Sequence, residues 1–241
     1  MALPKINTPT YDLTLPSTGK KIKYRPILVR EEKIQIKAFE TEDMAQITNA
    51  VVEILNDCIL TKGVSVNKLA TFDIEYLFLN VRAKSVGETV EVNITCPDDG
   101  KTSVQTEINI DSIKVKKVRG HKNIIKLDDQ YSMKLKYPSI TEFIESNFDV
   151  KDKSETLVDK TFKVIADCID TVYTEEDAWE GKDYTPTERV KFIEQLNSKQ
   201  YKEVEKFFST MPKLSKTIEV INPNTQEKSS IVLEGLADFF G

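Results

Sequence analysis

The chain has 241 residues, 39% of them hydrophobic and 30% charged, with few glycines and prolines, which is typical of an ordered, soluble globular protein. Its net charge of -5 argues against nucleic acid as a partner. The N-terminal stretch lacks the basic region and apolar core of a signal peptide, no apolar run approaches membrane-spanning length, and the three cysteines are an odd number, so we expect a cytoplasmic protein with free thiols.

The first predicted element is a β-hairpin around the stretch LPSTG at residues 15–19. This stretch also matches the L-P-x-T-G pattern of cell-wall sorting signals, but such a signal works near the C-terminus, ahead of an apolar segment. Here alternating apolar residues flank the stretch, with Leu13 and Leu15 before it and Ile22 and Tyr24 after it. Because this alternation is the pattern of half-buried strands, we interpret the stretch as a turn between two strands.

Helices are predicted after this hairpin. Apolar residues from Ile47 to Ile59 recur at helical spacing and place Cys58 on one buried stripe. Residues 69–85 are apolar on most sides, which predicts a second helix deep in the fold. In the second half, TPTE at 185–188 supplies an N-cap, a first-turn proline and a capping-box carboxylate, and Ser139 begins a second S-x-x-E helix start.

An internal repeat is the most informative feature of the sequence. Three pairs of similar stretches occur in the same order in the two halves: IKYRP and LKYP, ILNDCILT and VIADCIDT, and ETVEVNITCPDDG and KTIEVINPNTQE. We therefore predict an α+β fold of two tandem pseudo-repeat units, each with helices flanked by β-hairpins. The units are residues 1–118 and 119–241, with Cys58 equivalent to Cys168 and an insertion in the second unit at about 174–184.

Residue patterns that carry catalysis or bind metals are nearly lacking in the sequence. The single histidine, His121, is more simply an exposed residue of a basic linker than a catalytic base, and no G-x-S-x-G motif occurs. Cys96 in TCPDDG resembles half of a zinc site, but a second cysteine of the pair is missing, so a turn is favoured. A phosphate loop ending at Gly19 and Lys20 needs a glycine five residues before Gly19, but that position is occupied by Thr14. We predict no enzymatic activity, metal, cofactor or small-molecule substrate.

Two further charged stretches have simple interpretations. The basic stretch IKVKKVRGHK at 113–122 carries no aromatic residues, so a strand face or linker is favoured over a phosphate-binding patch. The acidic stretch TEEDAWEG lacks calcium-loop spacing, so a solvated loop is favoured over a cation site, although a basic partner is an alternative.

Contacts with other proteins are the remaining source of function, and large aromatic side chains outside the helical stripes are the candidates. The insertion holds Trp179 and Tyr184, and the chain closes with Phe239 and Phe240. The two terminal phenylalanines must either fold back onto the protein or dock on another one. We predict these four residues as partner-binding residues.

Three stretches resemble a known protein family. The triplet LPS at 15–17, the stretch FDIEYLFLNVRAKSVGE at 72–88 and the closing LEGLADFF are similar to baseplate proteins of T-even-like contractile-tailed phages. The two longer stretches are the specific ones. Within that group the chain resembles the baseplate hub assembly proteins over essentially its whole length.

The resemblance implies a non-enzymatic role in assembly of the central baseplate hub, as an assembly factor or chaperone. Other phage baseplate hub proteins would be its partners, without nucleic acid or membrane, and the host cytoplasm would be its location during assembly. The alternative is a permanent structural subunit of the virion tail baseplate, and an enzyme is the least favoured of the three.

Overall fold

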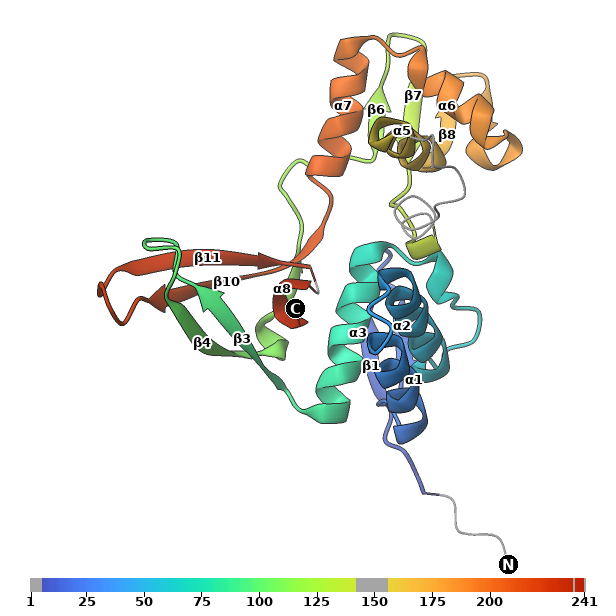
Figure 1. Ribbon diagram of the computed structural model, residues 1–241. Coiled ribbons are helices and arrows are strands. Elements are labelled where there is room, and N and C mark those ends of the chain that lie inside the picture. Colours follow the sequence, from blue (N-terminus) through green and yellow to red (C-terminus); the bar gives the residue numbers. More distant parts are fainter. Residues whose placement is uncertain (1–5, 142–155, 236, 241) are drawn as a thin grey trace, which may run out of the picture. The chain divides into compact units, whose positions relative to one another are not determined.

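The computed structural model describes residues 6–141, 156–235 and 237–240, and it divides into two compact units (Figure 1). Unit 1 combines residues up to 66, 72–116 and from 213 onward, while unit 2 combines 67–71 and 117–212. Helices and small antiparallel sheets occur in both units, so the predicted α+β class is confirmed. The C-terminal hairpin, predicted to belong to the second unit, lies in unit 1 because its first strand pairs with residues 114–116 of that unit.

Unit 1 begins with the hairpin that the alternation around LPSTG predicts. Leu13 of β1 faces Ile22 of β2 in an antiparallel register, and the Leu15 N–H donates to the Lys20 carbonyl (2.9 Å) to close the turn. Gly19 has a φ of 72°, a left-handed conformation that glycine adopts without steric cost. The hairpin and the helices after it are β1 (Tyr11–Thr14), β2 (Lys21–Tyr24), α1 (Val29–Phe39), α2 (Met44–Cys58) and α3 (Thr71–Val86).

A buried ion pair fixes the start of α1. Glu31 is fully buried, and its two carboxylate oxygens accept hydrogen bonds from the Arg25 guanidinium (3.0 and 3.1 Å) and from the Leu28 N–H (2.8 Å). Burial acts to raise the pKa of Glu31, but these bonds and one from Arg30 together lower it to about 2. The carboxylate is therefore charged inside the protein at neutral pH.

The predicted helices are confirmed where the structure describes them. Helix α2 starts at Asp43, whose carboxylate accepts hydrogen bonds from two first-turn N–H groups, and it buries Ile54, Leu55 and Cys58 of the predicted stripe. Helix α3 buries residues around much of its circumference, as its apolar sequence predicts. Glu142, the second residue of one predicted capping box, lies outside the described residues.

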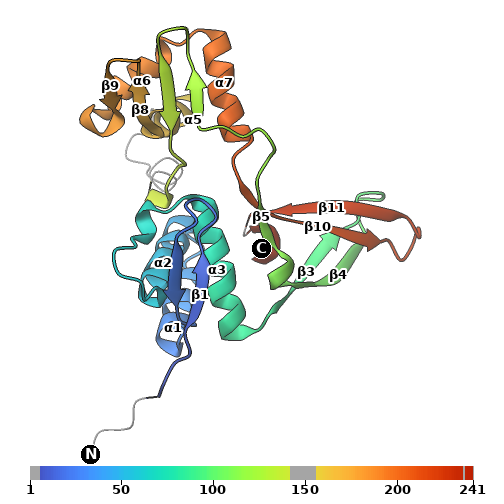
Figure 2. The ribbon, with the colours of Figure 1, turned by 180° about the vertical axis from the view of Figure 1, so that it is seen from behind.

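Two hairpins, residues 89–109 and 213–234, share a core cluster of unit 1 with α3, and Figure 2 shows the ribbons of these elements. Alternate residues of the first hairpin point inward, as Val90, Val92 and Ile94 do, and Leu79 of α3 packs in the same cluster. The second hairpin adds β5 as a third strand, giving the order β11-β10-β5. The elements are β3 (Thr89–Thr95), β4 (Ser103–Asn109), β5 (Lys114–Lys116), β10 (Lys213–Ile221), β11 (Lys228–Glu234) and α8 (Ala237–Phe240).

The turns of these two hairpins have the same backbone form and bind each other. Gly100 and Gln226 have φ values of 64° and 63°, and their N–H groups donate to the carbonyls of Cys96 (2.9 Å) and Asn222 (2.8 Å). The Asn222 Nδ2 then donates across to the Asp98 carboxylate (2.9 and 3.1 Å). The hairpin tips are therefore joined by a buried amide.

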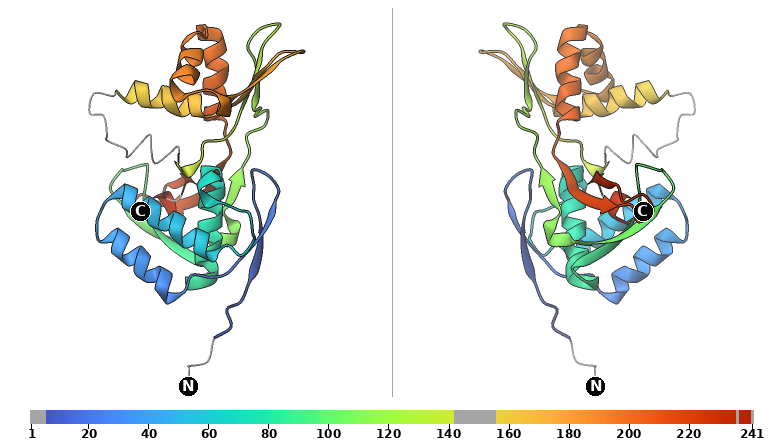
Figure 3. Two further views of the ribbon diagram at one scale, coloured as in Figure 1. Left: turned by 90° about the vertical axis from the view of Figure 1, so that its right-hand side faces the viewer. Right: turned by 90° about the vertical axis from the view of Figure 1, so that its left-hand side faces the viewer.

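Unit 2 is a four-stranded antiparallel sheet in the order β6-β7-β8-β9, with helices on one face (Figure 3). Its core joins inward residues of three strands, among them Met133 and Val172, to Ile165, Ile193 and Phe207, each from a different helix. The elements are β6 (Ile124–Lys126), β7 (Ser132–Leu135), α5 (Leu157–Asp167), β8 (Ile169–Tyr173), β9 (Ala178–Glu180), the 3-10 helix η3 (Gly181–Asp183), α6 (Pro186–Glu194) and α7 (Ser198–Ser209).

One local arrangement occurs in both units. Cys58 is the last residue of α2, and Cys168 is the C-cap of α5. Their carbonyls accept hydrogen bonds from the backbone N–H groups of Arg25 (3.0 Å) and Lys136 (2.8 Å), the residues that follow the second strand of each opening hairpin. The superposition of the two halves stays a prediction. The segment 174–184, expected to be an insertion, holds the β8–β9 turn, β9 and η3. No helix in the described ranges is long and apolar enough to cross a membrane.

Candidate partner-binding site

Trp179 and Tyr184 line the same hollow of about 640 Å³ in unit 2, which we call the Trp179 groove. Trp179 pairs with Val172 in the β8–β9 ladder, so both side chains point toward the helix-covered face. Tyr184 follows η3 and is 40% exposed. Apart from these residues, the apolar lining consists of Leu127, Tyr131, Ile169, Phe192 and Leu196.

The wall that carries Tyr184 is held tightly against the sheet. A Cβ atom on Gly181 would lie 2.2 Å from the Ile169 carbonyl oxygen, so this close approach requires a residue without a side chain. Arg189 of α6 donates from Nη1 to the carbonyls of Gly181 (3.1 Å) and Tyr184 (2.7 Å), and its Nη2 forms an ion pair with Asp167. Backbone and guanidinium together therefore preorganise the groove.

The start of α6 lies at the same wall and matches its predicted capping box. The Thr185 N–H donates to the Glu188 carboxylate (2.8 Å), and the Glu188 N–H donates to the Thr185 hydroxyl (3.3 Å). The hydrogen bond from the Thr185 side chain, followed by the one from its backbone, lowers the pKa of Glu188. The confirmed cap therefore places one negative charge at the edge of the groove.

Sequence reasoning did not identify two aromatic residues of the groove. Tyr131 ends the β6–β7 turn, and its ring centroid lies 6.1 Å from that of Trp179. Phe192 lies one helical turn beyond Glu188 on α6. Phe192 could have been placed on the same face of α6 as Glu188, because the two residues are four apart. No local pattern indicates that a turn residue such as Tyr131 contacts Trp179.

Acidic side chains occur in the groove lining and in the turn next to it. Segment 174–184 carries five acidic residues and one lysine. Glu175, Glu176 and Asp177 are exposed in the turn between β8 and β9, which leads into Trp179, and Asp128 is an exposed carboxylate of the lining itself. The site therefore combines an aromatic interior with an adjoining acidic turn, Glu175 to Asp177, which we call the rim.

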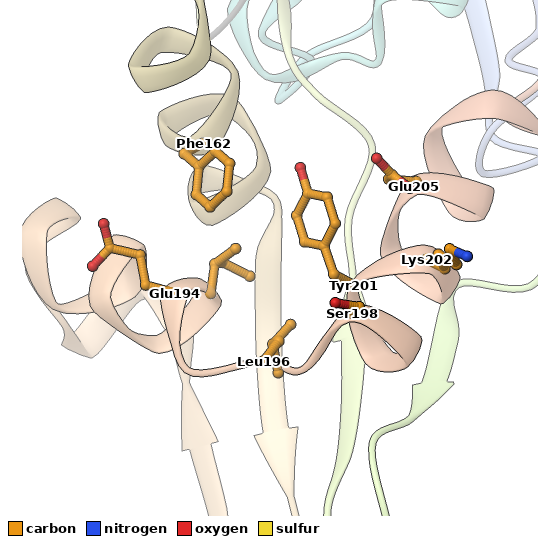
Figure 4. A pocket seen from close by; sticks show the side chains of 8 residues that line it. Phe162, Glu194, Leu196, Ser198, Tyr201, Lys202 and Glu205 are labelled. Atoms are coloured by element: carbon orange, nitrogen blue, oxygen red, sulfur yellow. The ribbon is translucent and has the colours of Figure 1, made fainter.

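A second, smaller hollow of about 260 Å³ shares Leu196 with the Trp179 groove (Figure 4). Phe162 of α5 stacks on Tyr201 of α7 with ring centroids 5.5 Å apart. Burial, with a smaller effect of Glu205, raises the pKa of the Tyr201 hydroxyl. The loop at Leu196 therefore separates two concave surfaces on the helical side of unit 2.

Phe239 is outside this site. Its side chain is 1% exposed and packs in the core of unit 1 with Leu79, Val90 and Leu233, because the terminal helix α8 folds back over the two hairpins. This fold-back, rather than docking on a partner, accounts for the first of the two terminal aromatic residues. The side chain of Phe240 lies outside the described part of the protein.

His121 is a packed residue rather than the exposed linker residue expected from the sequence. Its Nδ1 lies 2.9 Å from the Thr210 hydroxyl and its Nε2 3.0 Å from the Tyr137 hydroxyl, and its ring contacts the ring of Phe207 at 5.2 Å. Burial, assisted by Lys117, lowers the pKa of His121. The described residues contain no group of three or more His, Cys, Asp and Glu placed to hold a metal ion.

Comparison with known proteins identifies the family. A family model described as T4 bacteriophage base plate protein matches residues 8–241. No curated protein and no solved structure gives a match. Because the match covers nearly the whole chain, the chain belongs to the T4 bacteriophage base plate protein family and has a role in the phage tail baseplate together with other baseplate proteins.

Proposed function

We propose that this baseplate protein is a non-enzymatic assembly factor, or chaperone, for the central hub of the baseplate. The observation that carries the proposal is the Trp179 groove, in a member of a baseplate family whose sequence resembles the hub assembly proteins. Rigid aromatic side chains in a preformed hollow are the usual anchors of protein–protein contacts. Hub proteins are the proposed partners, and the host cytoplasm during assembly is the proposed location.

The surroundings of His121 support a role without catalysis. A histidine base must reach the proton of a nucleophile or substrate, whereas His121 has both ring nitrogens within hydrogen-bond distance of Thr210 and Tyr137. The three cysteines are buried, and burial, the largest effect, raises the pKa of Cys58 to about 11. Such a thiol is a weak nucleophile at neutral pH.

The sequence resemblance to hub assembly proteins is the reason for proposing an assembly factor over a permanent subunit. The groove, of about 640 Å³, is large enough to accept the anchor side chains of one partner segment in either role.

The alternative, a permanent structural subunit of the virion baseplate, predicts a different content of the finished particle. Quantitative mass spectrometry of purified virions should find this protein far below the copy number of a structural baseplate protein. Extracts of cells infected with a phage that lacks it should accumulate incomplete hubs. Stoichiometric recovery from virions would establish the permanent subunit instead.

The role of the groove in assembly is tested by Trp179→Ala. Association of this variant with co-expressed hub proteins should fall at least tenfold, because an aromatic anchor commonly contributes about 2 kcal/mol or more. Val232→Ala is the matched control, since Val232 is an exposed apolar residue of unit 1. Equal association of both variants with the hub proteins would argue against the groove.

A further inference from the structure

We propose that the Trp179 groove binds a basic segment of a partner baseplate protein, in which an arginine or lysine flanks an apolar side chain. This inference rests on the proposed function, because it specifies the chemistry of the hub protein that the groove recognises.

The acidic rim is the first observation behind this choice. In the part of the chain that the structure describes, Glu175, Glu176 and Asp177 take part in no ion pair, whereas Glu180 pairs with Lys182. Three adjacent carboxylates without ion pairs, in the turn that leads into Trp179, create a negative field near the groove that attracts a cationic segment and repels an acidic one. The same field disfavours nucleic acid as the occupant.

The aromatic interior is the second observation. The rings of Tyr131 and Trp179 lie 6.1 Å apart at the sheet side of the groove, and Tyr184 is exposed at the helix side. Indole and phenol faces attract a guanidinium or ammonium group. An arginine of the partner could therefore contact a ring and a rim carboxylate at the same time.

The cation in the groove lining does not oppose this binding. The Nη2 of Arg189 is paired with Asp167, and its Nη1 donates to two backbone carbonyls. Its charge is thus neutralised within the wall. Elsewhere in the lining, Val172, Phe192 and Leu196 supply the apolar surface that would take the partner's aliphatic or aromatic side chain.

The proposed occupant is a segment of another protein, although this chain also carries exposed basic residues at Lys117, Arg119 and Lys122. If these residues filled the groove of a second copy, the chain would associate with itself in a way that depends on the rim. Sedimentation velocity of the full chain distinguishes this occupant from a separate partner.

The test uses an array of overlapping peptides that covers the other baseplate proteins of the phage, probed with the full chain. The rim variant is Glu175→Lys/Glu176→Lys/Asp177→Lys. The control variant is Glu53→Lys/Glu107→Lys/Glu227→Lys, which changes the net charge equally at exposed positions of unit 1. Affinities of the selected peptides are then measured by fluorescence anisotropy.

The selected peptides should be enriched in arginine and lysine next to an apolar residue. The rim variant should weaken their binding about tenfold or more, while the control stays within about twofold of the wild type, as expected for local rather than net charge. Raising the salt from about 50 to 200 mM should weaken wild-type binding several-fold and change that of the rim variant much less.

Three results would overturn the inference. They are selection of neutral or acidic peptides, equal effects of the rim and control variants, and rim-dependent self-association without binding of any baseplate peptide. The assembly role is judged separately by the virion content and the incomplete hubs. If the protein is needed for hub assembly but binding at its groove does not depend on charge, this inference is refuted and the proposed function is not.

Discussion

Replacing Phe239 by alanine should destabilise unit 1 strongly, since this side chain closes the core between the two hairpins and α3. A phenylalanine buries about 150–250 Å², which at about 25 cal/mol per Å² corresponds to ~4–6 kcal/mol. This value is an upper bound because the unfolded chain already buries some of that area. The four-residue helix α8 can also partly collapse into the cavity, so we expect about 3–4 kcal/mol.

Urea unfolding followed by circular dichroism measures this loss, with Ile221→Ala as the control. Ile221 lies at the end of β10 and is 56% exposed, so its truncation should change the free energy of unfolding by less than about 1 kcal/mol. In binding assays below its melting temperature, Phe239→Ala should retain affinity for hub proteins. Wild-type stability together with lost association would show that Phe239 acts outside the core and would refute the reasoning.

Three further substitutions test other contacts. Glu31→Gln should lower the free energy of unfolding by about 3–5 kcal/mol, because it leaves the Arg25 charge unpaired in the interior. Since the folded pKa of Glu31, about 2, lies below the unfolded value, the stability of the wild type should fall as the pH is lowered from about 4.5 to 2. An equally steep fall in the variant would contradict this assignment. Gly181→Ala should lower stability by about 1–3 kcal/mol through the contact with the Ile169 carbonyl and weaken binding at the groove, and an unchanged melting temperature would show that η3 can move freely. Asn222→Ala should cost about 1–3 kcal/mol in urea unfolding, because its buried amide joins the hairpin tips, whereas a neutral effect would mean that water replaces it.

The features that the sequence predicted have causes within a few residues of the chain. The turn after Leu15 follows from its proline, glycine and flanking alternation. The start of α6 follows from donors and acceptors at Thr185 and Glu188, which find each other in any helix that begins there. Such local signals hold regardless of what packs against the element.

The sequence did not predict which strands pair with each other, because pairing depends on contacts that local patterns do not encode. Alternation identifies the inward residues of β10 but not the sheet that receives them, and β10 pairs with β5 from a distant part of the sequence. For the same reason the sequence marked Trp179 as an unusual aromatic residue in a polar stretch but could not join it to Tyr131 and Phe192. Phe239 was open to two interpretations because burial depends on a core assembled from remote segments.

The pairing of Lys116 with Lys213 has a consequence for the order of events during synthesis. The ribosome makes α3, β3 and β4 early, but β10, β11 and Phe239 emerge only after the whole of unit 2. At a synthesis rate of about 5–20 residues per second, the apolar surface around Leu79 and Val90 stays exposed for roughly ten seconds before the C-terminal hairpin is made. A nascent chain stalled near residue 210 is therefore expected to aggregate or recruit host chaperones, although unit 2 is by then almost fully synthesised.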